Sequence, residues 1–266
     1  MTQPIGKTIV LWTFVIAAIV TLSAPTIVVL GASFTSGNII TFPPDGFSVK
    51  WYQRIAQASD LRNAFLRTLW VATVCTAIAI PVGTLAGIAL AKHAVRFQKS
   101  IQVYLLLPFT IPLIGSGIGL MLVFGNAGML GQLWPVGVAC SVINLPFMIW
   151  AVTASAAGLD PDLELAAANC GAPPLQVFFS VTLPAVMPGV ITGSLLMFIL
   201  ALNEFLVSLL LVDARIVTLP VHIYNSIRSI ITPDLAAISV VFIACSALAI
   251  ALLDRLVGLE IFLKSK

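Results

Sequence analysis

The sequence predicts an all-α integral membrane protein, from its composition and from the spacing of its apolar stretches. Of 266 residues, 60% are hydrophobic and only 9% are charged, whereas a soluble globular domain carries roughly 25% charged residues. A helix that crosses a bilayer needs about 20 mainly apolar residues. Six stretches meet this condition within one transmembrane domain that covers residues 1–266, and we place them at about 9–31, 66–91, 101–124, 133–156, 188–212 and 235–257.

The first two spans are uncharged over most of their length and set the predicted orientation. A proline, Pro81, lies inside the second span, where we expect a kink. A short basic segment at 92–99 follows directly. Because short basic loops stay on the cytoplasmic side, six spans place both termini in the cytoplasm.

A short helix is expected between the first and second spans. Val49, Tyr52, Ile55 and Ala56 recur at helical spacing, which predicts an amphipathic helix on the outer membrane surface. A plain solvated loop is the alternative.

Residues 100–159 contain no charged residue and no histidine, so they form a hairpin of two spans with a turn at 125–128. The first arm holds Pro108 and Pro112, followed by three glycines. A helix broken in this way is tolerated at membrane depth only where protein or a water-filled cavity satisfies its backbone. Pro108 and Pro112 are therefore candidates for lining a substrate pathway. The alternative is that the small residues allow close helix packing.

The fifth span carries the only acidic residue deep in an apolar stretch. Asn203 and Glu204 lie in the sequence LALNEFLVSL. An acidic side chain in an apolar helix is costly and usually faces a cavity or a partner, so Asn203 and Glu204 are candidates for a pathway or gate that meets a cationic substrate. Snorkelling to the interface, or a hydrogen bond to a neighbouring helix, is the alternative.

The loop at 159–184 lies between two apolar spans and differs from both. Asp160 can cap a helix, and Pro161 suits its first position. Gly171 can end that helix in the left-handed conformation. Two prolines then precede a second short helix, at about 174–180. Two short helices with an elbow at a membrane surface suit a plug that fits a socket on a partner protein.

This loop resembles the EAA loop of ABC-importer permeases, whose pattern is Glu-Ala-Ala, three residues, Gly, nine residues and Ile-x-Leu-Pro. One departure is that Leu165 stands at the glutamate position and Glu164 comes just before it. Either Glu164 supplies the carboxylate from a neighbouring direction, or that contact is absent. The other coupling positions that the resemblance implies are Ala166, Ala167, Gly171, Val181, Leu183 and Pro184.

The resemblance implies a type I ABC-importer fold with a cytoplasmic coupling loop, in the inner membrane of a bacterium. Its implied partners are two copies of an ATPase, a second and non-identical permease, and an external substrate-binding protein. Segments such as FSVKWY resemble the spermidine/putrescine permease group, which implies a polyamine or a related amine or opine-like solute. ATP and magnesium would then bind to the ATPase.

The residues themselves indicate no enzyme and no cofactor. No GxxxxGK[ST] pattern occurs, so the chain has no P-loop of its own. We find no catalytic constellation and no metal-ligand spacing, and the basic residues are too scattered to indicate nucleic acid.

Two rival functions remain at this point. A secondary transporter driven by an ion gradient would need broken helices in two matching halves, but only the third span is strongly broken. A non-transporting scaffold subunit would tolerate the loss of both Glu204 and the broken helix.

Overall fold

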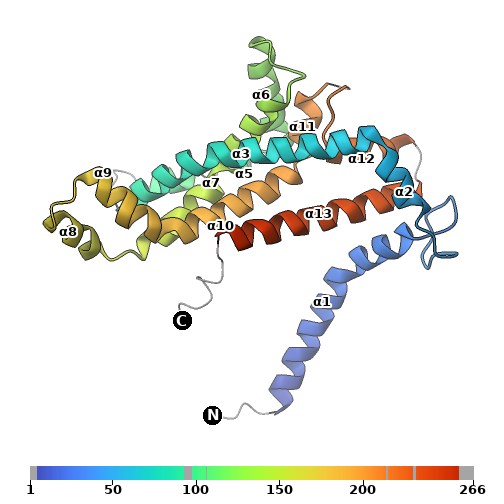
Figure 1. Cartoon of the computed structure of the whole chain (residues 1–266), viewed down its shortest axis with the longest axis horizontal. Coiled ribbons are helices and arrows are strands. Elements are labelled where there is room, and N and C mark those ends of the chain that lie inside the picture. Colours follow the sequence, from blue (N-terminus) through green and yellow to red (C-terminus); the bar gives the residue numbers. More distant parts are fainter. Residues whose placement is uncertain (1–4, 93–97, 106, 214, 230–231, 258–266) are drawn as a thin grey trace. The chain divides into compact units, whose positions relative to one another are not determined.

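The described part of the chain is mainly helical, as shown in Figure 1. The computed structural model describes residues 5–92, 98–105, 107–213, 215–229 and 232–257, and within these ranges no strand is present. The basic turn at 93–97 and the C-terminal tail at 258–266 lie outside the described residues. The helices are α1 (Ile5–Ser33), α2 (Lys50–Gln57), α3 (Ser59–Lys92), α4 (Gln98–Tyr104), α5 (Leu107–Thr110), α6 (Leu113–Asn126), α7 (Leu133–Ala157), α8 (Pro161–Asn169), α9 (Pro174–Val177), the π-helical turn η1 (Phe178–Thr182), α10 (Leu183–Leu202), α11 (Leu206–Leu211), α12 (Leu219–Ser229) and α13 (Pro233–Val257).

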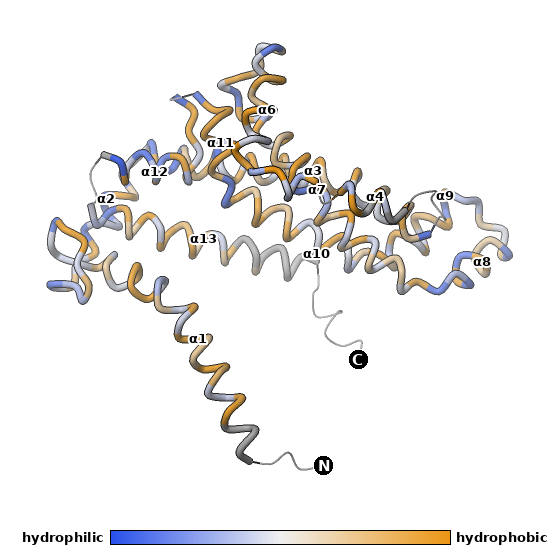
Figure 2. The backbone as a smooth tube through the Cα atoms, turned by 180° about the vertical axis from the view of Figure 1, so that it is seen from behind, coloured by the Kyte–Doolittle hydropathy of each residue, from blue (hydrophilic) through white to orange (hydrophobic). Residues whose placement is uncertain are grey.

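Four described helical stretches are long and apolar enough to cross a membrane. Two shorter apolar helices, Leu113–Asn126 and Pro233–Leu248, overlap the predicted third and sixth spans over most of their length. Figure 2 shows hydrophobic residues along α7 and α10, with hydrophilic residues gathered at α8. The four long stretches are Val10–Ser33, Ser59–Lys92, Leu133–Ala157 and Pro174–Leu202.

Two helical stretches have bounds that differ from the predicted ranges of the third and fifth spans. The stretch at 101–124 is divided among α4, α5 and α6, and the break at Ile111–Pro112 is the one that the prolines predict. The fifth helical stretch begins at Pro174 rather than at 188, and it is interrupted after Leu202. Pro81 lies inside α3, which continues as one helix to Lys92.

The chain contacts divide into two compact units. The first contains residues 1–62 and 223–245, and the second contains residues 63–222 and 246–266. The loop, the broken arm and Glu204 all belong to the second unit.

In the first unit, the segment after α1 folds around Trp51. Its indole N–H donates to the Thr35 carbonyl at 2.8 Å, and only 5% of the side chain is exposed. The hydroxyl groups of Ser33 and Tyr52 form a hydrogen bond at 2.6 Å. The helix expected at 49–56 is present as α2, but Trp51 rather than the predicted stripe forms its buried face, and Val49 is 56% exposed.

In the second unit, α7 is the central helix, and glycines let its neighbours approach it closely. A Cβ atom at Gly189 of α10 would lie 2.6 Å from the Ala151 carbonyl oxygen of α7. On α3, a Cβ atom at Gly87 would lie 2.9 Å from the Ile149 carbonyl oxygen. Hydroxyl groups add links, because Ser141 of α7 donates to the Cys75 carbonyl of α3 at 3.0 Å.

We predict that Gly189→Ala destabilises the protein, because the new methyl group meets backbone that cannot move aside without separating α7 from α10. Forcing extra volume into a close-packed core costs about 1–3 kcal/mol. The matched control is Gly119→Ala in α6, where no atom lies within 4 Å of the added Cβ. Thermal unfolding in detergent should show a lower midpoint for Gly189→Ala only. Equal midpoints for the two variants would contradict this packing.

Candidate functional site

The first short helix of the loop, α8, begins and ends as the sequence predicts. The Asp160 carboxylate accepts the backbone N–H of Asp162 at 3.0 Å, and Pro161 occupies the first turn. At the other end Gly171 adopts φ +86°, in the left-handed region. Its N–H donates to Ala168 at 2.9 Å, and the next N–H donates to Ala167 at 3.2 Å. These two bonds form a Schellman motif, which closes the helix and turns the chain sharply.

The second short helix is not separate, which corrects the predicted helix at about 174–180. A single helical stretch runs from Pro174 through α9 and η1 into α10. In η1 the Leu183 N–H donates to the carbonyl of Phe178, five residues earlier. Pro184 follows at once, and in a regular α-helix its ring would clash with the carbonyl four residues before it. The wider π-turn relieves that clash, so the prolines do not interrupt the helix.

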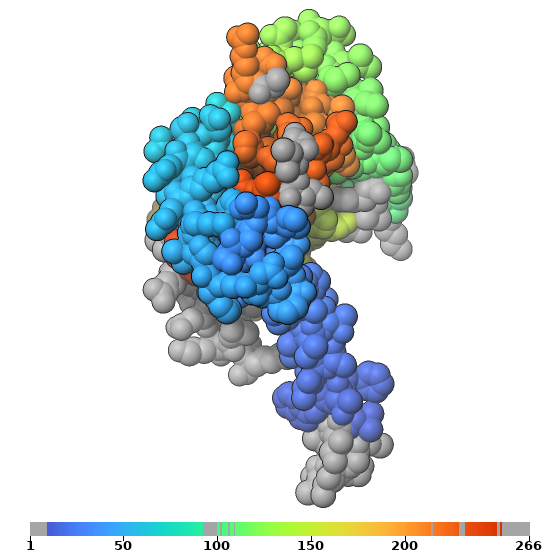
Figure 3. All heavy atoms as spheres, turned by 90° about the vertical axis from the view of Figure 1, so that its right-hand side faces the viewer, coloured from blue at the N-terminus to red at the C-terminus, as the bar shows by residue number. Residues whose placement is uncertain are grey.

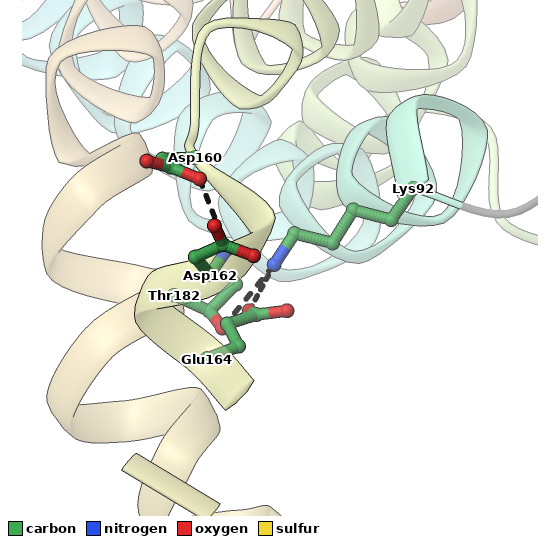
Figure 4. A network of polar contacts seen from close by, with 5 residues as sticks. All are labelled: Lys92, Asp160, Asp162, Glu164 and Thr182. Carbon is green, nitrogen blue, oxygen red and sulfur yellow. Dashed lines mark hydrogen bonds and ion pairs between the residues drawn. The ribbon is translucent and has the colours of Figure 1, made fainter. Parts of the chain in front are cut away.

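A polar cluster joins the loop to the end of α3 (Figure 4). Lys92, the last residue of α3, forms an ion pair with Glu164 of α8. The Thr182 hydroxyl of η1 donates to the same carboxylate oxygen, and the Lys92 ammonium lies 3.3 Å from that hydroxyl. Thr182 is buried, whereas the side chains of Lys92 and Glu164 are 20% and 29% exposed.

This cluster lowers the pKa of Glu164. The hydrogen bond from Lys92 is the main cause, and the hydrogen bond from Thr182 adds to it. Because the pKa is lower in the folded state, the cluster stabilises the fold above the ordinary pKa of the carboxyl group. That contribution is lost as the pH falls through the lowered value, so the cluster is intact at neutral pH.

The predicted coupling residues divide between an exposed and a half-buried set. Leu165 is 59% exposed, and Ala166, Gly171 and Pro184 are also exposed. Ala167, Val181 and Leu183 are half-buried. The exposed face also carries large apolar side chains, since Leu163, Leu175 and Phe179 are 51%, 74% and 62% exposed. Such a patch on a loop with polar ends is typical of a protein-binding surface.

Asn203 and Glu204 form a break between α10 and α11. The Asn203 amide donates to the Ile199 carbonyl at 2.9 Å, at the end of α10. One carboxylate oxygen of Glu204 accepts the Val207 N–H at 3.0 Å, at the start of α11. The Glu204 carboxylate thus supplies a hydrogen bond that the interrupted backbone loses, whereas the Ile199 carbonyl also accepts the backbone N–H of Asn203 at 3.2 Å. Glu204 is half-buried and Asn203 is exposed.

Pro108 and Pro112 lie in a second, separate break. Pro108 lies in α5, and Pro112 is the residue before α6, with an extended ψ of 131°. The helix that follows packs on α11, where a Cβ atom at Gly117 would lie 2.6 Å from Leu210. Figure 3 shows these two segments side by side, in green and orange. Of the three glycines in the arm, only Gly117 makes this close contact between helices, which supports the packing interpretation at that position alone.

A cavity of about 790 Å³ lies between α3 and the η1–α10 stretch. Apolar side chains form most of its wall, and Phe178 and Phe179 stand at the loop end. Thr84 also lines the cavity, and its hydroxyl is buried without a hydrogen-bond partner. The side chains of α3 and α10 are therefore not fully packed along this face.

Sequence reasoning missed Lys92 and Thr182 as parts of the site. Lys92 was interpreted only as one of several basic residues that fix orientation. The signal available was the predicted topology itself, which places the end of the second span and the loop at the same membrane face.

Apolar helices long enough to cross a membrane and a capped, partly apolar loop are compatible with a transport permease, and the comparisons identify the family. Residues 48–259 match the family model of the binding-protein-dependent transport system inner membrane component. The chain belongs to this family, which is a permease component of ABC importers rather than an enzyme.

Relatives differ in the solute that they carry. The chain is 28% identical over 228 residues to the putrescine transport system permease protein PotI of Escherichia coli K12, covering 82% of this chain and 80% of PotI. It is 30% identical over 205 residues to the molybdenum transport system permease protein ModB of Mycobacterium tuberculosis H37Rv, covering 71% and 77%.

A solved structure shares the fold. A bacterial ABC transporter involved in the import of the acidic polysaccharide alginate superposes with a TM-score of 0.72 at 15% identity. The match covers 96% of this chain and 98% of that chain. The type I importer fold expected from the loop motif is therefore confirmed.

We predict that Gly171→Val loosens the loop, because a β-branched residue is strained at φ +86° by about 1–3 kcal/mol. Gly171→Asn is the matched control, since asparagine tolerates the left-handed region and no atom lies within 4 Å of the added Cβ. Limited proteolysis should cut the loop faster in Gly171→Val than in Gly171→Asn. Identical cleavage rates would show that the left-handed turn does not hold the loop.

Proposed function

We propose that this ABC-importer permease subunit carries a small amine, a polyamine or a related opine-like solute, and that its coupling loop at 159–184 receives movement from an ATPase. Half of the translocation pathway is formed by this chain and half by a second, non-identical permease. Two ATPase copies bind ATP and magnesium on the cytoplasmic side, and an external protein delivers the solute. The chain forms one permease domain, 1–266, with six crossings and both termini in the cytoplasm.

The continuous helix from Pro174 to Leu202 is the observation that carries the coupling role. The exposed apolar side chains of the loop, which include Leu165 and Phe179, offer a docking surface for the ATPase. Because α9, η1 and α10 form one continuous helical stretch, a displacement of the loop from Pro174 onward tilts the whole span. Ala166 and Gly171 add little bulk, which lets the loop enter a socket.

The amine substrate is supported by Glu204 and by the polyamine permease relatives. A carboxylate in the break between α10 and α11 gives a negative charge within an apolar span. Asn203, beside it, adds an amide. The break before Pro112 lies in the arm that packs on α11, so both interruptions belong to helices that contact each other. In this proposal both breaks face the solute pathway.

The test of this function is a purified complex of the chain with its neighbouring ATPase, second permease and binding protein, reconstituted in liposomes. We expect ATP-dependent uptake of putrescine, with no uptake of molybdate. Uptake driven by an ion gradient without the ATPase would establish a secondary transporter instead. Uptake of molybdate but not putrescine would show that the amine assignment is wrong.

We predict that Glu204→Gln lowers amine uptake by about tenfold or more, since a hydrogen bond to a charged group contributes about 1.5–3 kcal/mol. The glutamine oxygen can still accept the Val207 N–H, so thermal stability should be nearly unchanged. Glu204→Ala is the comparison that loses both the charge and the cap, and it should also unfold at a lower temperature. Unchanged uptake and preference in Glu204→Gln would exclude Glu204 from the pathway.

A further inference from the structure

The Lys92–Glu164–Thr182 cluster has a role that the motif resemblance does not assign. We infer that Glu164 is a positioning residue that fastens the coupling loop to the cytoplasmic end of α3, and that it does not serve as the contact to the ATPase. This inference rests on the proposed function and specifies how the loop moves the spans.

The cluster joins three separate elements through one carboxylate oxygen. Lys92 ends α3, Glu164 lies in the first turn of α8, and Thr182 lies in η1. Each pair among these three side chains is joined by a hydrogen bond or an ion pair (Figure 4). Thr182 is 3% exposed and Glu164 is half-buried, so water competes only partly for these bonds.

The glutamate stands one residue before its position in the motif, and this shift explains why the Glu164 side chain points toward α3. Successive residues of an α-helix are turned by about 100° around its axis. Leu165, at the motif position, is 59% exposed, whereas Glu164 turns toward α3 and forms the ion pair. An apolar side chain therefore occupies the position that faces a partner, and the carboxylate is used inside the chain.

The cavity between α3 and the η1–α10 stretch explains why the Lys92–Glu164–Thr182 cluster affects how α3 moves with the loop. Between Thr73–Leu85 of α3 and Phe178–Phe198 of the η1–α10 stretch, about 790 Å³ is not filled by side chains. Packing along this face is therefore incomplete, and the polar cluster at its end holds α3 to the loop. With the cluster intact, a displaced loop moves α3 together with α10. With the cluster broken, the loop moves α10 while α3 lags behind.

The experiment uses the complete reconstituted importer and measures bound ATPase, ATP hydrolysis and solute uptake per ATP. We expect Glu164→Gln and Lys92→Met each to lower uptake per ATP by about two- to fivefold, the range for ion pairs of this exposure. ATPase binding and hydrolysis should remain. The double variant should be no worse than either single variant, because both remove the same link. The charge-reversed pair Glu164→Lys with Lys92→Glu should recover much of the uptake.

Two controls separate this role from a general loss of structure. Asp162→Asn removes a carboxylate from the same turn of α8 and should transport like the wild type. Lys92→Arg keeps the ion pair and should also retain uptake.

Three results would overturn the inference. Loss of the ATPase in Glu164→Gln but not in Lys92→Met would identify Glu164 as an ATPase contact. Wild-type uptake per ATP in both single variants would show that the link transmits nothing. A wild-type chain that forms no complex with an ATPase would overturn the proposed function itself, and this inference with it.

Discussion

The close approach of α3 and α10 to α7 is the constraint on which the second unit depends. In lipid no hydrophobic force drives helices together, because acyl chains are as apolar as leucine side chains. Close van der Waals contact and hydrogen bonds between helices take over that role. Gly87 and Gly189 bring backbone against backbone, and Ser141 adds a hydrogen bond from α7 to α3. These contacts hold α3 and α10 against α7 at Gly87 and Gly189.

This packing determines what the loop can do. The helix that leaves the loop at Pro174 continues into α10, and α10 packs on α7 at Gly189. In the proposed mechanism, the loop is therefore the end of a lever whose middle lies on α7. The π-turn keeps that lever continuous despite Pro184. Where the helix breaks after Leu202, the Glu204 carboxylate replaces a missing backbone bond by accepting the Val207 N–H. Backbone groups in an apolar medium need hydrogen-bond partners. This requirement applies both to the continuous helix from Pro174 and to the breaks between helices.

The sequence predicts features that depend on local chemistry. The cap at Asp160, the left-handed Gly171 and the break at Pro112 follow from side-chain and backbone preferences that act within a few residues. The continuity of η1 with α10 was not predictable in this way, since prolines usually end a helix and a π-turn leaves no signature. The partnership of Lys92 with Glu164 was missed for another reason, because it joins residues that are far apart in the chain.

Sequence identity does not distinguish between a cationic and an anionic solute, whereas the charge of a residue in the pathway can. The putrescine permease and the molybdenum permease match this chain at 28% and 30% identity, so identity alone favours neither. Two like charges 4 Å apart repel by about 4 kcal/mol at an effective dielectric of 20. An ionised Glu204 in the pathway would thus repel an oxyanion. It would attract an ammonium group at the same distance with an energy of similar magnitude. In the proposed pathway, a single carboxylate in a helix break would separate two substrate classes between which the overall similarity does not choose.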